Sequence, residues 1–151
     1  MRAALEFRFP SDPKWLKGLR NIVSLVCERN GFSEYDIGVM TLAVDEACAN
    51  IIKHTYSGCL EERIVARCIV DDTHIEFQLE DTGPRVDLEK IKARPLDELR
   101  PGGLGTYFMN QAMDQVIYDS TDNPDGSGNL LRLIKYKSDG TVKGNDNGDQ
   151  C

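Results

Sequence analysis

The 151-residue sequence lacks the features of membrane, secreted and nucleic-acid-binding proteins. It has no apolar run near the ~18 residues that a membrane-spanning helix needs, and no apolar stretch of a signal peptide at its N-terminus. Its five cysteines are odd in number and form no C-x-x-C pair, which is typical of a reducing cytoplasm. The 18 Lys and Arg against 25 Asp and Glu give a net charge of −7, and an acidic chain repels nucleic-acid phosphates and anionic lipid. We therefore expect a cytoplasmic protein that contacts neither nucleic acid nor a membrane directly.

The composition otherwise indicates one globular domain. Apolar residues make up 40% of the chain and charged residues 28%, and 151 residues are too few for a second independently folding core. Residues 138–151 are polar and rich in glycine. We therefore expect one domain over residues 1–137, followed by a flexible tail.

Hydrophobic patterning and turn residues predict the order of helices and strands. The predicted strands cover residues 3–9, 63–70, 74–80, 115–119 and 130–136, and the predicted helices cover 13–30, 33–54 and a segment after Gly105. Residues 84–102 form a charged, proline-containing stretch that is too long for an ordinary connection and predicts a lid. This order predicts an α+β fold, a two-layer sandwich with helices on one face of a mostly antiparallel sheet.

Apolar spacing also predicts which side chains fill the core. In the strand at 74–80, Ile75, Phe77 and Leu79 alternate with polar residues, so one sheet face should be covered and the other solvated. The expected core positions are Trp15, Leu19, Ile22, Val23 and Val26 in the first helix and Tyr107, Phe108, Ala112 and Met113 in the last.

A carboxylate and an amide lie one turn apart on the second predicted helix. Glu46 and Asn50 are four residues apart and project from one face, which alone indicates a solvated polar surface. Here Val39 and Leu42 lie within about 40° of Glu46 around the helix axis. Burying polar groups unpaired costs several kcal/mol, so the pair needs water, a metal ion or a ligand as a partner. We expect this face to line a cavity.

A second motif, Asp81–Gly83, follows the end of a predicted strand. Asp and Gly are common in turns, and a turn is one interpretation. In the other, the carboxylate of Asp81 accepts a hydrogen bond from an amino group, and Gly83 lets a flat ring approach the backbone. An ionised Asp81 would then select adenine, which offers an amino donor where guanine offers an oxygen acceptor.

A third motif, Pro101–Phe108, places three glycines directly before a predicted helix. Free backbone N–H groups and the helix dipole make such a junction an anion site, although a glycine hinge without a ligand fits equally well. The motif is neither a Walker A loop nor a dinucleotide fingerprint.

Taken together and in this order, the three motifs give the chain a resemblance to a known family. It resembles the GHKL (Bergerat-fold) ATP-binding domains, specifically the small anti-sigma-factor serine kinases, to about Tyr136 and including "MNQAMDQV" after the third motif. The sequence departs from the family pattern at Thr55, Arg85 and Thr106.

The resemblance implies binding of ATP and Mg²⁺ and assigns roles to residues. Asn50 would hold Mg²⁺, Glu46 would be the catalytic base, and Asp81 would read the adenine. The complete set of implied cofactor-binding residues is Asn50, His54, Asp81, Gly83, Arg100, Gly102, Gly103, Leu104, Gly105 and Thr106. Two of these have an alternative: Arg100 is either near the γ-phosphate or solvated, and His54 contacts either the ligand or the core edge.

The resemblance also implies a protein serine kinase that phosphorylates a STAS-type antagonist, binds a sigma factor and forms a homodimer. Two alternatives are a module that hydrolyses ATP with water and one that only senses ATP or ADP. The basic residues Lys14, Lys17 and Arg20 form either a docking strip for an acidic partner or a solvated helix face.

Overall fold

The computed structural model describes residues 2–89 and 104–138. The lid predicted over residues 84–102 lies mostly outside these ranges, as does the tail predicted over 138–151. None of the helices formed by the described residues combines the length and hydropathy that a bilayer crossing requires.

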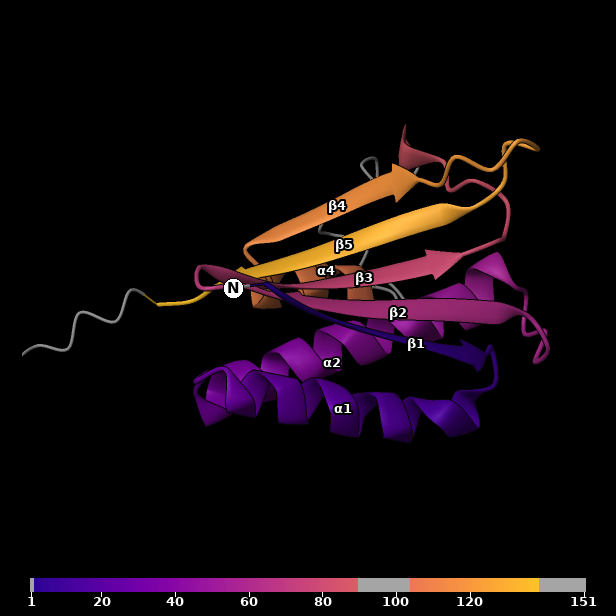
Figure 1. The fold of residues 1–151 in the computed structure, drawn as a ribbon. Coiled ribbons are helices and arrows are strands. Elements are labelled where there is room, and N and C mark those ends of the chain that lie inside the picture. The colour runs from indigo at the N-terminus through magenta and orange to yellow at the C-terminus, as the bar shows by residue number, and fades with distance from the viewer. Residues whose placement is uncertain (1, 90–103, 139–151) are drawn as a thin grey trace, which may run out of the picture.

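The described residues form a five-stranded antiparallel sheet covered by helices on one face (Figure 1). In chain order the elements are β1 (Ala3–Pro10), η1 (Pro13–Trp15), α1 (Leu16–Arg29), α2 (Glu34–Asn50), η2 (Ile51–Thr55), β2 (Arg63–Val70), β3 (His74–Asp81), α4 (Leu104–Ala112), β4 (Gln115–Ser120) and β5 (Asn129–Tyr136). The strand order is β1-β2-β3-β5-β4, and each neighbouring pair is antiparallel. The predicted α+β two-layer sandwich is confirmed.

The ends of the first two long helices follow from local sequence. Asp12 accepts a hydrogen bond from the Lys14 N–H (3.0 Å), and Pro13 opens the short η1 turn that leads into α1. After α1, Gly31 has φ +79°, a conformation that favours glycine. Ser33 then caps α2 by accepting from the N–H of Asp36 (3.1 Å).

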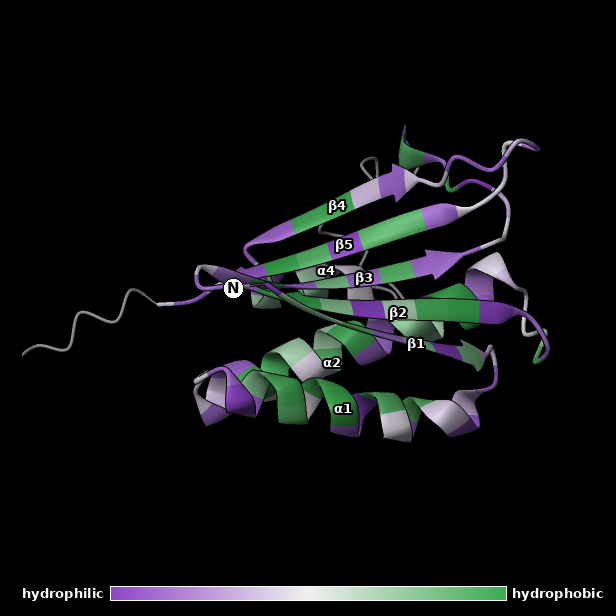
Figure 2. Cartoon of the chain, in the orientation of Figure 1, coloured by the Kyte–Doolittle hydropathy of each residue, from purple (hydrophilic) through white to green (hydrophobic). Residues whose placement is uncertain are grey.

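The core lies between the sheet and the helices. Ile75, Phe77 and Leu79 of β3 are buried as predicted, and they face Met40 and Val44 of α2 across the same apolar layer. Figure 2 shows apolar stretches in the helices and in the strands that they cover.

Four side chains expected in the core are exposed instead. Trp15 is 48% exposed because it lies in η1, before α1 begins, and Ile22 lies about 90° around α1 from its buried stripe. On α4, Tyr107 and Phe108 are 40% and 44% exposed. The buried side of that helix is centred instead on its methionine, Met109, at 1% exposure.

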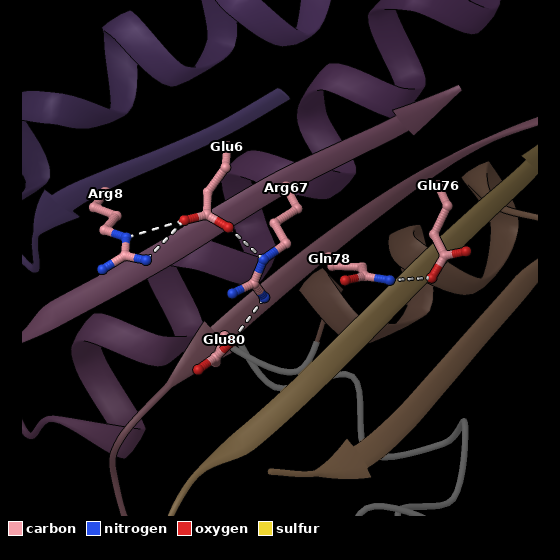
Figure 3. A network of polar contacts seen from close by, with 6 residues as sticks. All are labelled: Glu6, Arg8, Arg67, Glu76, Gln78 and Glu80. Atoms are coloured by element: carbon pink, nitrogen blue, oxygen red, sulfur yellow. Dashed lines mark hydrogen bonds and ion pairs between the residues drawn. The ribbon is translucent and has the colours of Figure 1, made fainter. Parts of the chain in front are cut away.

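The other sheet face is not simply solvated. Arg67 of β2 donates to Glu6 Oε2 of β1 (2.7 Å) and to Glu80 Oε2 of β3 (2.6 Å), and Arg8 also donates to Glu6 (Figure 3). Further along the same face, Glu76 is only 3% exposed. The prediction of a wet face is therefore wrong at this position, where long charged side chains cover the sheet.

Glu76 is held in its ionised form by its hydrogen-bond donors. Burial opposes the charge, but Arg132 Nε (2.6 Å) and Gln78 Nε2 (2.8 Å) donate to its carboxylate, and the pKa of Glu76 lies below its usual range. A carboxylate with a lowered pKa stabilises the fold above its unfolded pKa of about 4.3, and this contribution disappears as the pH falls through the folded pKa.

Arg132→Ala should lower the free energy of unfolding by about 1–3 kcal/mol at neutral pH, because a buried carboxylate loses its strongest donor. Urea denaturation measures this change, and the loss should shrink as the pH falls below about 4. Arg8→Ala is the matched control, since Arg8 forms an exposed pair with Glu6 and its removal should change little. Equal destabilisation by both substitutions would contradict this account.

Candidate active site

The first and third sequence motifs meet where α4 crosses α2. A Cβ atom placed on Gly105 would lie 2.8 Å from Glu46 Oε2 and 3.5 Å from Asn50 Nδ2, so a side chain there would displace the end of the Glu46 side chain. Glu46 and Asn50 are partly buried, and neither side chain forms a hydrogen bond or ion pair with another residue in the described ranges. Two polar groups facing a helix start without internal partners form the kind of site that a ligand completes.

The neighbouring acid, Asp45, has a different environment. Its position around the helix predicts a solvated side chain, but it accepts a hydrogen bond from Arg20 Nη1 of α1 at 2.8 Å. Arg20 therefore ties α1 to α2. Lys14 lies 3.6 Å from Asp12. Two of the three residues of the predicted basic strip, Lys14 and Arg20, therefore form ion pairs with acids of the same chain.

The second motif reaches the same helix through η2. This segment is a π-helix, in which the Tyr56 N–H donates to the Ile51 carbonyl (2.9 Å). The wider turn brings the methyl group of Thr55 against Gly83, where a Cβ would overlap it. His54, on the same segment, is exposed, so the alternative that places it at the core edge is not what the structure shows.

Asp81 is a buried carboxylate rather than a surface turn residue. It is 3% exposed, and its Oδ1 accepts from the Gly83 N–H (3.0 Å) and from Asn129 Nδ2 (2.9 Å). Burial raises the pKa of Asp81 above its usual range, against the opposing effect of these hydrogen bonds. A raised pKa at a buried carboxyl group, at the end of a strand, is typical of functional sites.

Two residues that hold the turn after β3 in place, Tyr56 and Asn129, were not predicted from the sequence. The buried Tyr56 hydroxyl donates to the Arg63 carbonyl (2.6 Å) and accepts from the Thr82 N–H (2.8 Å). Asn129 is brought to Asp81 by the register of β5 against β3. A tyrosine after a helix and an asparagine at a strand start carry no local signal for these contacts.

Only some of the remaining predicted site residues lie in the part of the chain that the structure describes. Arg100, Gly102 and Gly103 lie outside the described residues. Leu104 begins α4, so Gly105 and Thr106 stand in its first turn, where backbone N–H groups are free for an anion. Arg85, one of the departures from the family pattern, reaches the Thr121 carbonyl at 3.4 Å.

The residues present suit a magnesium–nucleotide complex better than a metal held by protein alone. Within residues 2–89 and 104–138, no three His, Cys, Asp or Glu side chains are grouped to hold a metal ion. The Asn50 side-chain amide lies beside Gly105, with its Nδ2 3.5 Å from the position of an added Cβ, and its oxygen is the atom that would hold a metal ion. Mg²⁺ usually takes one or two protein oxygens and completes its shell with water and phosphate, so this donor set fits it.

Comparison with known proteins assigns the class that this fold and site define. Residues 9–135 match the histidine kinase-like ATPase domain, and the chain belongs to that family. The expected GHKL, anti-sigma-kinase type is confirmed.

Individual proteins within this family also resemble the chain. The chain is 29% identical to the serine-protein kinase RsbW of Oceanobacillus iheyensis over 150 residues, covering 94% of this chain and 92% of that protein. It is also 29% identical to RsbW of Bacillus velezensis over 140 residues, covering 87% and 84%. A chain in the SiaB–SiaC complex from Pseudomonas aeruginosa shares the fold with a TM-score of 0.68 at 14% identity, covering 86% of this chain and 89% of that one.

Gly83→Ala should lower the free energy of unfolding by about 1–3 kcal/mol, because the new methyl group overlaps Thr55. Thr55→Ser removes the opposing methyl, so the double variant should recover most of that loss in urea denaturation. Gly38→Ala is the matched control on α2, where a Cβ has no neighbour within 4 Å. If Thr55→Ser restores nothing, the close approach of these two residues is not the reason.

Proposed function

We propose that the protein is an ATP-dependent protein serine kinase of the anti-sigma-factor type. The observation that carries the proposal is the pair Glu46 and Asn50, partly buried and without side-chain partners in the described ranges, against the glycine at the start of α4. Membership of the ATPase family and similarity to relatives named serine-protein kinase support it.

The proposed chemistry is phosphoryl transfer from ATP to a serine hydroxyl. Glu46 orients the hydroxyl and accepts its proton, a role that suits a carboxylate with no cation partner among the described residues. The N–H groups of the first turn of α4 face the phosphates. Asn50 holds Mg²⁺, which when bound neutralises phosphate charge.

The proposed base recognition uses the second motif. Asp81 accepts from the adenine amino group. Gly83 is assigned to the base side of the site, where its missing side chain lets the turn after β3 pack against Thr55. Arg100, Gly102, Gly103, Leu104 and Thr106 are assigned to the phosphate side, and His54, exposed on η2, to the outer edge of the site.

The proposed partners follow from the family that the sequence resembles. The serine acceptor is a STAS-type antagonist domain, and the regulated partner is a sigma factor, as expected for a cytoplasmic anti-sigma factor. A homodimer is the proposed assembly. A solved structure that shares this fold is a complex of two proteins, SiaB and SiaC, which supports assembly with a second protein.

Incubation with Mg-[γ-³²P]ATP and a purified candidate antagonist tests the function. Label on a serine of the antagonist is the expected result. Release of free phosphate alone identifies an ATP-hydrolysing module, and nucleotide binding without either product identifies a nucleotide sensor. Each of these two results overturns the kinase proposal.

Glu46→Gln should reduce phosphate transfer by about 10²–10⁴-fold while ATP affinity stays near that of the wild type, because a general base acts on the reacting hydroxyl. Single-turnover transfer and equilibrium ATP binding measure the two quantities. Asp45→Asn is the matched control, since the adjacent acid is turned toward Arg20 and should leave transfer intact. Unchanged transfer in Glu46→Gln refutes the assignment.

Asp81→Asn should abolish the preference for ATP over GTP. Two donors converge on Oδ1, so the amide oxygen of the variant is held at that position and its NH₂ group replaces Oδ2. That NH₂ group repels the adenine amino group and donates to the guanine oxygen, a change of roughly tenfold or more in the affinity ratio. Competition binding of Mg-ATP and Mg-GTP measures it, and a variant that still discriminates shows that adenine is read elsewhere.

A further inference from the structure

Asn129, the first residue of β5, joins the buried carboxylate to the segment that follows it. Its Nδ2 donates to Asp81 Oδ1 and to the Pro84 carbonyl, both at 2.9 Å. Its Oδ1 accepts from the Val86 N–H at 2.8 Å. One amide therefore uses both its donor and its acceptor ends to hold Asp81 and the turn beyond Gly83.

The position of this amide is set by the sheet. Asn129 lies directly opposite Asp81 in the β3–β5 ladder, so the two side chains project from the same face. The Gly128 N–H donates to the Gly83 carbonyl (2.8 Å), which fixes the backbone beside the pair. Gly128 has φ +97°, and a Cβ there would overlap Thr121, so this approach also requires glycine. Asn129 is thus held in place by backbone contacts that do not involve a ligand.

The contact determines which oxygen of Asp81 faces a ligand. Oδ1 already receives the Gly83 N–H and the Asn129 amide. Two donors on one oxygen stop the carboxylate from rotating and favour its ionised form. Burial acts in the opposite direction and raises the pKa of Asp81, so the loss of one donor would favour the neutral acid. A neutral acid presents a hydroxyl and no longer distinguishes a donor from an acceptor.

We propose that Asn129 is the positioning residue for base selectivity: it holds Oδ1 of Asp81 so that Oδ2 is presented, as an acceptor, to the amino group of adenine. This inference rests on the proposed reading of adenine by Asp81. It adds to that function a residue on a different strand, which acts only through Asp81 and the turn.

Asn129→Leu and Asn129→Asp test the inference through the ratio of Mg-ATP to Mg-GTP affinity, measured by equilibrium binding across the neutral pH range. The ratio is used because both nucleotides carry the same triphosphate, whose titration cancels. Asn129→Leu removes the donor at every pH, and the ratio should fall roughly tenfold throughout. Asn129→Asp keeps the shape and the acceptor for Val86 but brings a second carboxyl group to Asp81.

The ratio of Mg-ATP to Mg-GTP affinity should depend on pH in Asn129→Asp, whereas in Asn129→Leu it should not. At higher pH the two carboxylates repel each other and the ratio should be low. As the pH falls, one proton binds to the pair, and the new carboxyl group can donate to Asp81 Oδ1 as the amide does, so the ratio should rise toward the wild-type value. The other titratable groups beside Asp81 are Glu80 and Tyr56, and they are the same in every variant.

Controls separate positioning from stability and from the proposed function. Asn30→Leu removes an amide that donates to the Val26 carbonyl (2.7 Å) at the C-terminal end of α1, at the opposite end of the sheet from the end of β3, and should leave the ratio unchanged (Figure 1). Near-ultraviolet circular dichroism and melting temperature without nucleotide verify folding.

Three outcomes overturn the inference. A wild-type ratio in Asn129→Leu, or equal and pH-independent losses in both Asn129 variants, overturns the role of Asn129 alone. An unaltered ratio in Asp81→Asn overturns adenine reading by Asp81, and this inference with it.

Discussion

Two close contacts made by glycines hold the candidate site together. Gly105 brings the start of α4 onto Glu46 and Asn50, and Gly83 brings the turn after β3 onto Thr55. Both contacts are made to one continuous helical segment, α2 followed by η2. A side chain at Gly83 would overlap Thr55, and one at Gly105 would displace the Glu46 carboxylate. The absence of both side chains therefore lets α4 and the turn after β3 pack closely against the α2–η2 segment. The absence of a side chain at Gly83 and at Gly105 therefore shapes the site as much as its charged groups do.

The environments of the glutamates distinguish the site from the rest of the surface. Glu6, Glu76 and Glu80 lie on the open sheet face, and each is paired with an arginine. Glu46 is also partly buried, yet it has no cation among the described residues. Pairing offsets the cost of burial at Glu76 and Glu80, whereas Glu46 retains that cost. The contrast supports a functional role for Glu46, since a partly buried carboxylate without a cation needs another partner, such as a ligand.

Much of the fold could be predicted from the sequence because the relevant signals are local. The helix starts predicted at residues 13 and 33 and the alternation of β3 rest on short-range patterns, and the structure begins these helical segments at Pro13 and Glu34. The faces of helices were less predictable: Tyr107 and Phe108 are apolar but point away from the core that Met109 fills. Apolarity alone does not say which side of a short helix is covered.

The residues of the candidate site also fall into those that have a local sequence signal and those that do not. Glu46, Asn50 and Gly105 could be selected from spacing and from family resemblance, and the structure brings them together. The contacts of Tyr56 and Asn129 with the turn after β3 could not, because they depend on the register of strands and on a π turn. The register between strands that are distant in sequence, such as β3 and β5, cannot be predicted from any short segment of the chain.

The π turn at Ile51–Thr55 has a consequence for how this chain tolerates changes in length. A π turn accommodates one more residue than an α turn would, and it delivers Thr55 to Gly83 and Tyr56 to Thr82. Deleting a single residue from it would restore α winding, in which four residues complete about the same rotation as the five residues of the π turn, so Thr55 and Tyr56 would keep their direction toward β3. The stretch at 57–62 is held separately, because the Ser11 hydroxyl donates to the Cys59 carbonyl (2.6 Å) and accepts from the Glu62 N–H (3.1 Å). Related chains that have one residue fewer in the π turn should therefore keep the contact between Tyr56 and Thr82.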